Sequence, residues 1–226
     1  MTDTNILLAQ ATELTKRWGD GAGLQPFSFT LSASELVVVR GRSGSGKSTL
    51  LSLLAGWIAP DAGSLVRLGP WASAGVEGTW RGTAILPQVI APIAELTMTE
   101  NVALPLRLAG TPRLAANSLA RVVLAKLGLT DEADRAASDS SLGQQQRMAL
   151  ARAAVIEPIV MLADEPTSHQ DAGHIFTVLE LLREMVSAGS CIVVASHDAA
   201  VAEVADRVLD LDRAEQPGVR RSQPRL

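Results

Sequence analysis

GRSGSGKST, residues 41–49, has a glycine at each end of a four-residue spacer, followed by a lysine and a hydroxyl residue. The run Glu35–Val39 before it is typical of a buried strand, and leucines recur at helical spacing in Lys47–Trp57 after it. The stretch therefore predicts a loop that ends at a helix N-terminus, where unpaired N–H groups and the helix dipole favour a bound phosphate. The predicted nucleotide-binding residues of this loop are Gly41, Ser43, Gly44, Ser45, Gly46, Lys47, Ser48 and Thr49.

Two side chains of this loop have separate expected roles. Lys47 is expected to reach the outer phosphates of a nucleotide, and Ser48 to offer its hydroxyl to Mg²⁺. A chance glycine-rich turn is the alternative, but the strand before the loop and the helix after it argue against that alternative. A phosphate loop alone leaves kinases, GTPases and motor ATPases open, so the remaining motifs must decide among them.

A second apolar run, Ile159–Ser168, contains two adjacent carboxylates at the end of its apolar part. Parallel strands deliver such acids to the carboxyl edge of a sheet, where ligands of open α/β folds bind. We expect Asp164 to hold Mg²⁺ and Glu165 to face an attacking water. The alternative for Glu165 is a surface acid at a strand end.

Two further segments complete the order of elements. Ser140–Ala153 is a small-residue turn that enters a helix, and Cys191–Asp198 is a third strand-like run that delivers His197. His197 is expected to act at the site, the alternative being a simple strand cap.

With these motifs in this order, the chain resembles the ATP-binding-cassette (ABC) ATPases from about Leu7 to Asp212. The resemblance implies an α/β fold: a P-loop NTPase core with a mostly parallel sheet, an N-terminal antiparallel β portion up to about Gly69, and a helical subdomain over about residues 90–145. It implies ATP and Mg²⁺ as ligands. It also assigns Gln88 as the Q-loop glutamine, Ser140–Gln144 as the signature motif, Asp171 as the D-loop aspartate, His197 as the switch histidine and Trp18 as the residue that stacks on adenine.

The resemblance further implies how these residues act. Glu165 would orient and deprotonate the water, His197 would hydrogen-bond the γ-phosphate, and Gln88 would sense Mg²⁺ and the water. The plainer alternatives are loop filler for Gln88 and ordinary packing for Trp18. Asp171 could instead be the N-cap of a helix over about residues 172–186.

The signature and D-loop depart from the family's usual LSGGQ and SALD. Ser140 replaces the leucine and Leu142 the first glycine, while Ser141, Gly143 and Gln144 remain. We expect Leu142 to crowd the nucleotide sandwich and slow turnover. The D-loop reads SHQD, from Ser168 to Asp171.

By resemblance, Ser141, Gly143 and Gln144 complete the nucleotide site of a second cassette, with Ser141 and Gly143 touching its γ-phosphate. One chain should therefore hold ATP without hydrolysing it well. A homodimer is expected, with a paralogue as the alternative partner.

Composition is consistent with one α/β domain over residues 1–212. The 226 residues carry a net charge of -4, which argues against a general nucleic-acid footprint. The sole cysteine, Cys191, is expected to be a small buried apolar residue. No stretch approaches the roughly 20 apolar residues that span a bilayer, and the N-terminal residues do not resemble a signal peptide. Residues 213–226 are expected to be a frayed tail, with attraction of their arginines to a membrane surface as the alternative.

Three functions compete for the ATPase. Leu96–Gly110 and the signature helix look like the lipoprotein-release and macrolide-export branch, which implies an energising subunit of a membrane exporter, bound to a separate permease at the cytoplasmic face of the membrane. The second is a regulatory ATPase of the cell-division type, which controls cell-wall hydrolases without transport. The third is a soluble ATPase of DNA repair or ribosome work, a class that usually carries long coiled-coil insertions or two cassettes, neither of which is present here.

Overall fold

The computed structural model describes residues 6–19, 21–77 and 82–212. The expected tail, from residue 213, lies outside these ranges. Along the described chain the elements are β1 (Leu7–Arg17), β2 (Gly23–Ser32), β3 (Glu35–Arg40), α1 (Lys47–Ala55), β4 (Ala62–Arg67), α2 (Gly69–Glu77), β5 (Thr83–Leu86), α3 (Met98–Leu108), α4 (Arg113–Lys126), the short 3₁₀ helix η1 (Ala137–Asp139), α5 (Leu142–Ala154), β6 (Val160–Asp164), α6 (Ala172–Ser187), β7 (Cys191–Ala195), α7 (Ala199–Glu203) and β8 (Arg207–Asp210).

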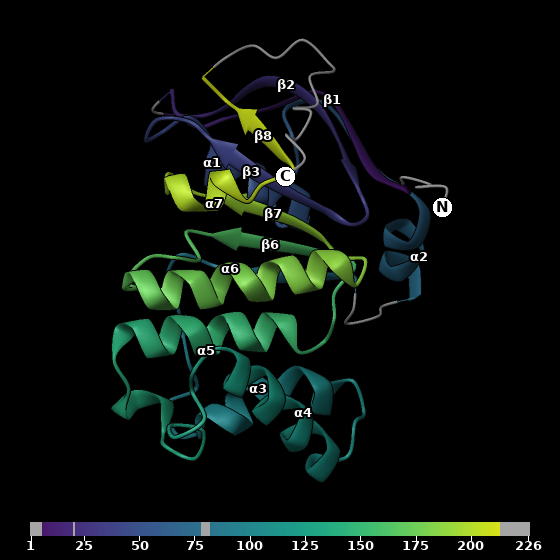
Figure 1. The fold of residues 1–226 in the computed structure, drawn as a ribbon. Helices are drawn as coiled ribbons and strands as arrows, with labels where there is room; N and C mark the ends of the chain where they lie inside the picture. Colours follow the sequence, from purple (N-terminus) through teal and green to yellow (C-terminus); the bar gives the residue numbers. More distant parts are fainter. Residues whose placement is uncertain (1–5, 20, 78–81, 213–226) are drawn as a thin grey trace, which may run out of the picture.

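The strands form two sheets. The larger has the order β5-β6-β7-β3-β8, and all of its pairings are parallel. The smaller has the order β2-β1-β4 and is antiparallel. In Figure 1 the antiparallel strands lie above the parallel sheet, and α6 and α5 follow below it. The expected parallel core with an N-terminal antiparallel portion is confirmed.

Side chains that point alternately to the two faces of the parallel sheet divide the interior into two hydrophobic cores. Leu36 and Val38 of β3 pack with α5, α6 and the helices of the lower part, whereas Val37 and Val39 pack with α1 and the antiparallel sheet. Successive side chains of a strand point to opposite faces, so a sheet covered on both sides reads as a continuous apolar run. Cys191 of β7 belongs to the second core and is fully buried, as the sequence predicts.

The lower part of the molecule in Figure 1 is made mainly of helices α3 and α4. The sequence predicts a helical pattern over about residues 99–129, bent or interrupted at Pro105. Helix α3 instead continues through Pro105 to Leu108, and the break falls before α4 begins at Arg113. The reason is local: Gly110 takes a φ of 91° and Pro112 is the N-cap of α4, so the chain turns there.

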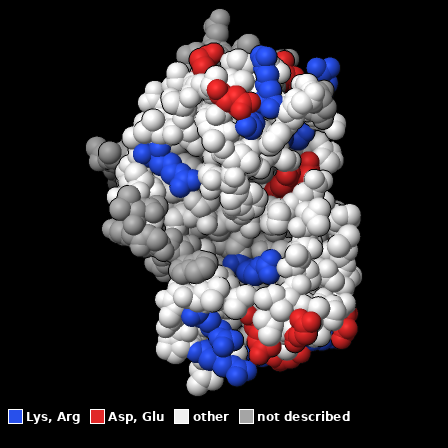
Figure 2. All heavy atoms as spheres, turned by 180° about the vertical axis from the view of Figure 1, so that it is seen from behind, with Lys and Arg blue, Asp and Glu red and all other residues white. Residues whose placement is uncertain are grey.

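Charged side chains on the face opposite to that of Figure 1 are interspersed in sign. At the lower end of this view, basic and acidic groups lie next to each other, and residues without charge dominate the middle (Figure 2). In the helical part, Arg113 pairs with Glu100 at 3.2 Å, and Arg121 pairs with Asp134. These surface charges therefore offset one another locally. No helix in the described ranges combines the length and apolar character that crossing a bilayer requires.

Candidate functional site

The first turn of α1 presents backbone N–H groups that no side-chain hydrogen bond caps. Gly46 is the N-cap of α1, with a φ of 99° and no side-chain capping bond. A Cβ at Gly46 would lie 2.7 Å from the carbonyl oxygen of Gly23, so only glycine fits this close approach to β2. Gly41 and Gly44 also have positive φ values, of 154° and 80°. The curled loop and the uncapped first turn of α1 thus form a site suited to phosphate.

The ammonium of Lys47 folds back over this loop. Its Nζ donates to the carbonyl oxygens of Gly41, at 2.7 Å, and Arg42, at 3.1 Å. The positive charge therefore lies beside the same uncapped amides. Ser43 is exposed, Ser45 is partly buried with a buried hydroxyl that has no hydrogen-bond partner, and Thr49 lies in the first turn of α1.

Ser48 joins α1 to the end of β6. Its Oγ donates to Oδ2 of Asp164 at 2.7 Å, although 116 positions separate the two residues. Burial raises the pKa of the Asp164 carboxyl, and the adjacent Glu165 charge adds to the rise, while the Ser48 hydrogen bond and the Lys47 charge oppose it.

The pair fits a magnesium ion by its donor chemistry. A hydroxyl and a carboxylate oxygen are hard ligands, and Mg²⁺ is usually held by one or two such groups together with substrate phosphates. Among the described residues, no three His, Cys, Asp or Glu side chains cluster as an all-protein metal site. Such a cluster is not what a phosphate-bound Mg²⁺ requires.

Glu165 lies in a strained backbone conformation directly after β6. Its φ is 51°, in a region that residues other than glycine rarely adopt. Its Oε1 lies 2.8 Å from Nδ1 of His197, and its Oε2 accepts a hydrogen bond from Ser196 Oγ at 2.9 Å. The Glu165 side chain is 12% exposed and that of His197 is 84% exposed. The carboxylate is therefore held from two sides at the carboxyl edge of the parallel sheet.

Two of the groups that hold Glu165 were missed from the sequence. Ser196 precedes His197 directly after β7, and that adjacency is the only signal that could have indicated it. Gln146 is 1% exposed, and its Nε2 donates to the carbonyl oxygen of Glu165 at 3.3 Å. Nothing in its sequence neighbourhood indicates this contact, because it depends on how α5 packs beneath β6.

Gln88 and Trp18 flank the same region from other elements. Gln88 is exposed in the loop after β5, and β5 pairs with β6 in parallel, so Gln88 and Asp164 follow strands that end at one edge of the sheet. Trp18 follows β1 and is 45% exposed. Its Nε1 donates to Thr49 Oγ1 at 3.3 Å, which places the indole beside the first turn of α1.

The signature segment forms the N-terminus of α5. Ser141 is the N-cap and makes a capping box with Gln144: the Gln144 N–H donates to Ser141 Oγ at 3.2 Å, and the Ser141 N–H donates to Gln144 Oε1 at 2.9 Å. A Cβ at Gly143 would lie 2.7 Å from the carbonyl oxygen of His169, so glycine is required there. Leu142, at the glycine position of the family pattern, is 50% exposed.

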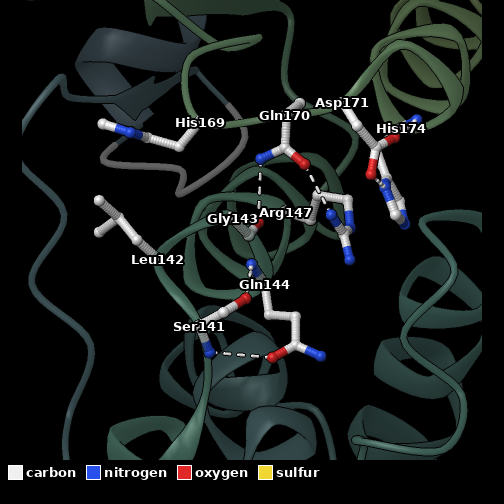
Figure 3. Close-up of a pocket in the computed structure, with 9 residues that line it drawn as sticks. All are labelled: Ser141, Leu142, Gly143, Gln144, Arg147, His169, Gln170, Asp171 and His174. Atoms are coloured by element: carbon white, nitrogen blue, oxygen red, sulfur yellow. Dashed lines mark hydrogen bonds and ion pairs between the residues drawn. The ribbon is translucent and has the colours of Figure 1, made fainter.

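The signature and D-loop segments line one hollow, shown in Figure 3. Gln170 connects them: its Nε2 donates to the carbonyl oxygen of Gly143 at 3.0 Å, and its Oε1 accepts from Arg147 Nη1 at 2.6 Å. Burial lowers the pKa of the Arg147 guanidinium. The sequence singled out neither Gln170 nor Arg147 for this role. No residue of the phosphate loop lines the hollow, so the chain carries two separate groups of site residues.

Asp171 has the capping role that the sequence left open. It is the N-cap of α6, and its carboxylate accepts the N–H of His174 at 3.0 Å and lies 2.8 Å from His174 Nδ1. These hydrogen bonds lower the pKa of the Asp171 carboxyl. Its side chain is therefore engaged within its own chain.

Comparison with known protein families and curated proteins gives consistent matches. A family model described as "ABC transporter" matches residues 24–168. An ABC transporter ATP-binding protein of Mycobacterium tuberculosis is 37% identical over 202 residues, covering 86% of this chain and 61% of the relative. The lipoprotein-releasing system ATP-binding protein LolD of Idiomarina loihiensis is 36% identical over 219 residues, covering 92% of this chain and 94% of the relative. The chain spans only about three fifths of the mycobacterial relatives, 61% and 57% of their lengths.

Solved structures show the same arrangement of elements. The dimeric structure of MJ0796, a bacterial ABC transporter cassette, superposes with a TM-score of 0.80 at 26% identity, covering 92% of this chain and 97% of that one. A dimeric post-hydrolysis state of MJ0796 bound to ADP and Pi superposes with a TM-score of 0.79 at 27% identity, covering 90% and 94%.

Proposed function

This chain belongs to the ABC transporter family of ATPases, and we propose that it is the ATP-hydrolysing subunit of a membrane exporter that works with a separate permease. The observation that carries the proposal is the contact between Ser48 and Asp164 at the mouth of an uncapped helix N-terminus. It brings phosphate-binding amides and magnesium-type oxygen ligands to one place.

The chain's own residues account for ATP binding. The first-turn amides of α1 and the Lys47 ammonium face the phosphates, and Lys47 exchanges its bonds to the loop carbonyls for bonds to phosphate oxygens. Ser48 and Asp164 would hold Mg²⁺, with Gln88 as a further ligand from the neighbouring strand end. A magnesium ion held there would supply positive charge that offsets the charge of the phosphates.

Hydrolysis is assigned to the residues at the end of β6 and β7. Glu165 orients the attacking water and accepts its proton, which its acceptor oxygens and position after a rigid strand permit. Ser196 and His197 hold that carboxylate in place, and His197, being exposed, is also available to the γ-phosphate. Phosphoryl transfer depends mainly on such positioning and charge stabilisation.

A second cassette completes the site in this proposal. Ser141, Gly143 and Gln144 lie in a hollow apart from the phosphate loop, so they serve the nucleotide of a partner chain. The dimeric MJ0796 structures support this arrangement. The partner is proposed to be a second copy, and the pair to lie at the cytoplasmic face of the membrane.

The likeness to LolD, which covers 94% of that relative, supports the lipoprotein-release branch and hence export. A regulatory role in cell division is an outcome of the test rather than a second proposal.

The test has two arms. Purified protein should hydrolyse Mg·ATP, and Lys47→Ala should abolish hydrolysis; wild-type protein without ATPase activity would reject the proposal. Tagged chain purified from membranes should bring with it a permease with a large extracytoplasmic domain. If its ATPase rate then rises with a cell-wall hydrolase partner and not with lipidated or hydrophobic cargo, the regulatory function is the correct one.

A further inference from the structure

The indole of Trp18 is held at two points while part of its ring stays open. Its Nε1 donates to Thr49 Oγ1 at 3.3 Å. The ammonium of Lys16 lies over the ring, 5.4 Å from its centroid, within the range of a cation–π attraction. Trp18 is nevertheless 45% exposed, so a planar ligand can still reach the ring beside the phosphate loop.

Lys16 is itself fixed in position. Its Nζ lies 2.7 Å from Asp61 Oδ1, and its side chain is only 19% exposed. Asp61 Oδ2 accepts the N–H of Arg17 at 2.9 Å, and the Asp61 N–H donates to the carbonyl oxygen of Thr15 at 2.8 Å. The hydrogen bonds from Arg17 and Lys16 lower the pKa of Asp61, so this carboxylate stays ionised at neutral pH and keeps its partner.

The antiparallel sheet sets the positions of both Lys16 and Asp61. Lys16 lies near the end of β1, and Asp61 directly precedes β4, which pairs with β1 in the antiparallel sheet. Groups placed on strands are held more precisely than groups placed on loops. Through its contact with Lys16, the indole ring of Trp18 is therefore held in a defined position relative to this sheet.

We infer that Lys16, anchored by Asp61, is a positioning residue for nucleotide recognition that holds the Trp18 ring in place for stacking against the base. This inference rests on the proposed function and deepens it. A ring fixed before binding loses less conformational freedom when the base stacks, so affinity improves without a direct contact between Lys16 and the nucleotide. The hydrogen bond from Trp18 Nε1 to Thr49 Oγ1 holds the same ring at a second point.

The experiment separates the base from the phosphates. Calorimetric titration with ATP and with inorganic tripolyphosphate, both with Mg²⁺, would be made on wild-type protein and on Lys16→Met, Lys16→Arg and Lys126→Met. We expect Lys16→Met to weaken ATP binding about fivefold and to leave tripolyphosphate binding unchanged, because only ATP has a base. Lys16→Arg should retain most of the ATP affinity, since arginine also stacks on aromatic rings and pairs with carboxylates.

Lys126→Met is the matched control, because Lys126 forms a surface ion pair with Glu184 between α4 and α6, away from Trp18. It should bind both ligands like the wild type. A second check compares Trp18→Ala with Trp18→Ala combined with Lys16→Met: the two should bind ATP equally if Lys16 acts through the ring.

Three results would overturn the inference. These are an unchanged ATP affinity in Lys16→Met, an equal loss of affinity for ATP and tripolyphosphate, and a further loss when Lys16→Met is added to Trp18→Ala. Wild-type protein that binds no ATP would instead reject the proposed function, so the two failures are distinguishable.

Discussion

Asp164 combines a partly buried position with a carboxylate to which the proposed function assigns Mg²⁺ binding, and the two requirements oppose each other. Burial raises its pKa above the ordinary value of 3.8, so the folded protein favours the neutral acid. A raised pKa stabilises the fold only below the unfolded-state pKa, and that contribution is lost as the pH rises through the folded-state pKa. At neutral pH the charge on Asp164 therefore lowers the free energy of unfolding.

Asp164→Asn should consequently stabilise the nucleotide-free protein. We expect its thermal midpoint to exceed that of the wild type by a few degrees at about pH 7.5, with the difference shrinking as the pH falls through the raised folded-state pKa toward 3.8, because the folded wild type then holds Asp164 in its neutral form. Thermal unfolding across this pH range without Mg²⁺ measures it. Asp61→Asn is the control of opposite sign: the pKa of Asp61 is lowered, so this variant should lose stability at neutral pH and less on acidification. A midpoint for Asp164→Asn that is lower at about pH 7.5 would contradict the argument.

Leu142 is an exposed apolar side chain at a position where the family usually has glycine. It is 50% exposed at the first residue of α5. We expect Leu142→Gly to raise the ATPase rate about twofold or more, equivalent to roughly 0.4 kcal/mol or more off the barrier, because it removes crowding at the dimer contact. Steady-state ATPase assays would measure it, with Leu114→Gly, another exposed leucine in the first turn of a helix, as the control. An unchanged rate in Leu142→Gly would dismiss the crowding hypothesis.

At the scale of single residues, the sequence predicted the identities of the chemical groups better than their neighbours. Ser48 and Asp164 come from two separate motifs, and the structure brings them to 2.7 Å because Asp164 ends β6 and Ser48 lies in the first turn of α1, whose loop follows β3 at the same edge of the parallel sheet. Ser196 and Lys16 could not be found in this way. Ser196 contacts Glu165, which follows β6, and Lys16 contacts Asp61, which precedes β4. No local periodicity predicts contacts between residues so far apart in the sequence.

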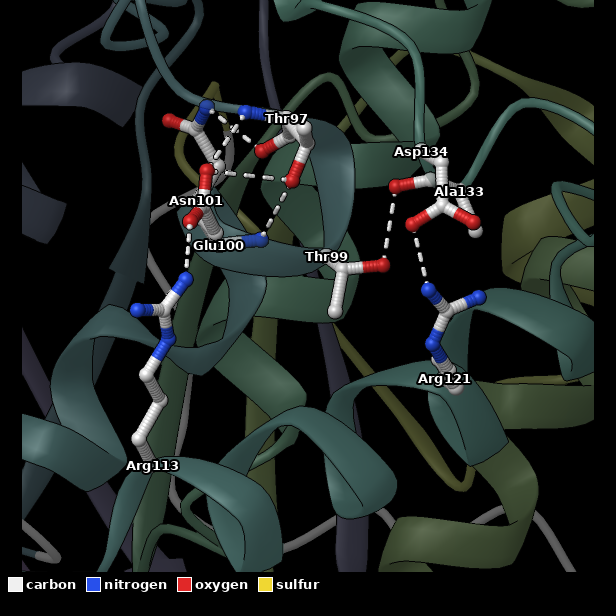
Figure 4. Close-up of polar contacts among 8 residues, drawn as sticks. All are labelled: Thr97, Thr99, Glu100, Asn101, Arg113, Arg121, Ala133 and Asp134. Atoms are coloured by element: carbon white, nitrogen blue, oxygen red, sulfur yellow. Dashed lines mark hydrogen bonds and ion pairs between the residues drawn. The ribbon is translucent and has the colours of Figure 1, made fainter.

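At the scale of elements, one buried asparagine organises the segment that leads from Gln88 into α3. Asn101 is fully buried; its Nδ2 donates to the carbonyl oxygens of Ile93, Leu96 and Thr97, and its Oδ1 accepts the N–H of Ile93. Figure 4 shows it beside the capping box of Thr97 and Glu100. The start of α3 thus fixes the preceding loop through side-chain hydrogen bonds.

Asn101→Ala should remove these bonds and leave the N–H of Ile93 without its side-chain acceptor, whereas the carbonyl oxygens of Ile93, Leu96 and Thr97 keep their backbone donors. We expect it to lower the free energy of unfolding by about 1–3 kcal/mol, measured as a lower urea midpoint. Asn117→Ala is the matched control in α4: the buried Oδ1 of Asn117 has no hydrogen-bond partner, so its removal should be neutral or slightly stabilising. Equal effects of the two substitutions would show that the Asn101 bonds contribute nothing specific.

The helical part also shows where pattern reading failed. Apolar periodicity correctly indicated helices between about residues 99 and 129, and Pro105 was expected to bend or interrupt the helix; an interruption there is wrong, because α3 includes Pro105. The effective stop was the pair Gly110 and Pro112, a glycine with positive φ followed by a proline at the next helix start. The parallel sheet was easier to predict, because strands buried on both faces appear as uninterrupted apolar runs.

At the scale of the whole molecule, the two separate groups of site residues support the proposal that ATP hydrolysis requires two chains. Glu165→Gln tests this, because glutamine keeps the shape of the side chain but cannot accept the proton from water. We expect the variant to bind ATP and form dimers in its presence, seen by light scattering on a sizing column, while turnover falls by about 100-fold or more. Dimers should persist in this variant because ATP remains intact between the two chains, and ADP should not support them.

Glu157→Gln is a matched control for this experiment. Glu157 also has a positive φ, of 48°, and is exposed shortly before β6, whereas Glu165, with a φ of 51°, directly follows that strand. The two substitutions therefore make the same chemical change in similar backbone conformations on the two sides of one strand, and only Glu165 lies at the carboxyl edge of the sheet. Glu157→Gln should hydrolyse ATP like the wild type. Full activity in Glu165→Gln would reject Glu165 as the base, and a Glu165→Gln protein that binds ATP but stays monomeric would reject the two-chain site.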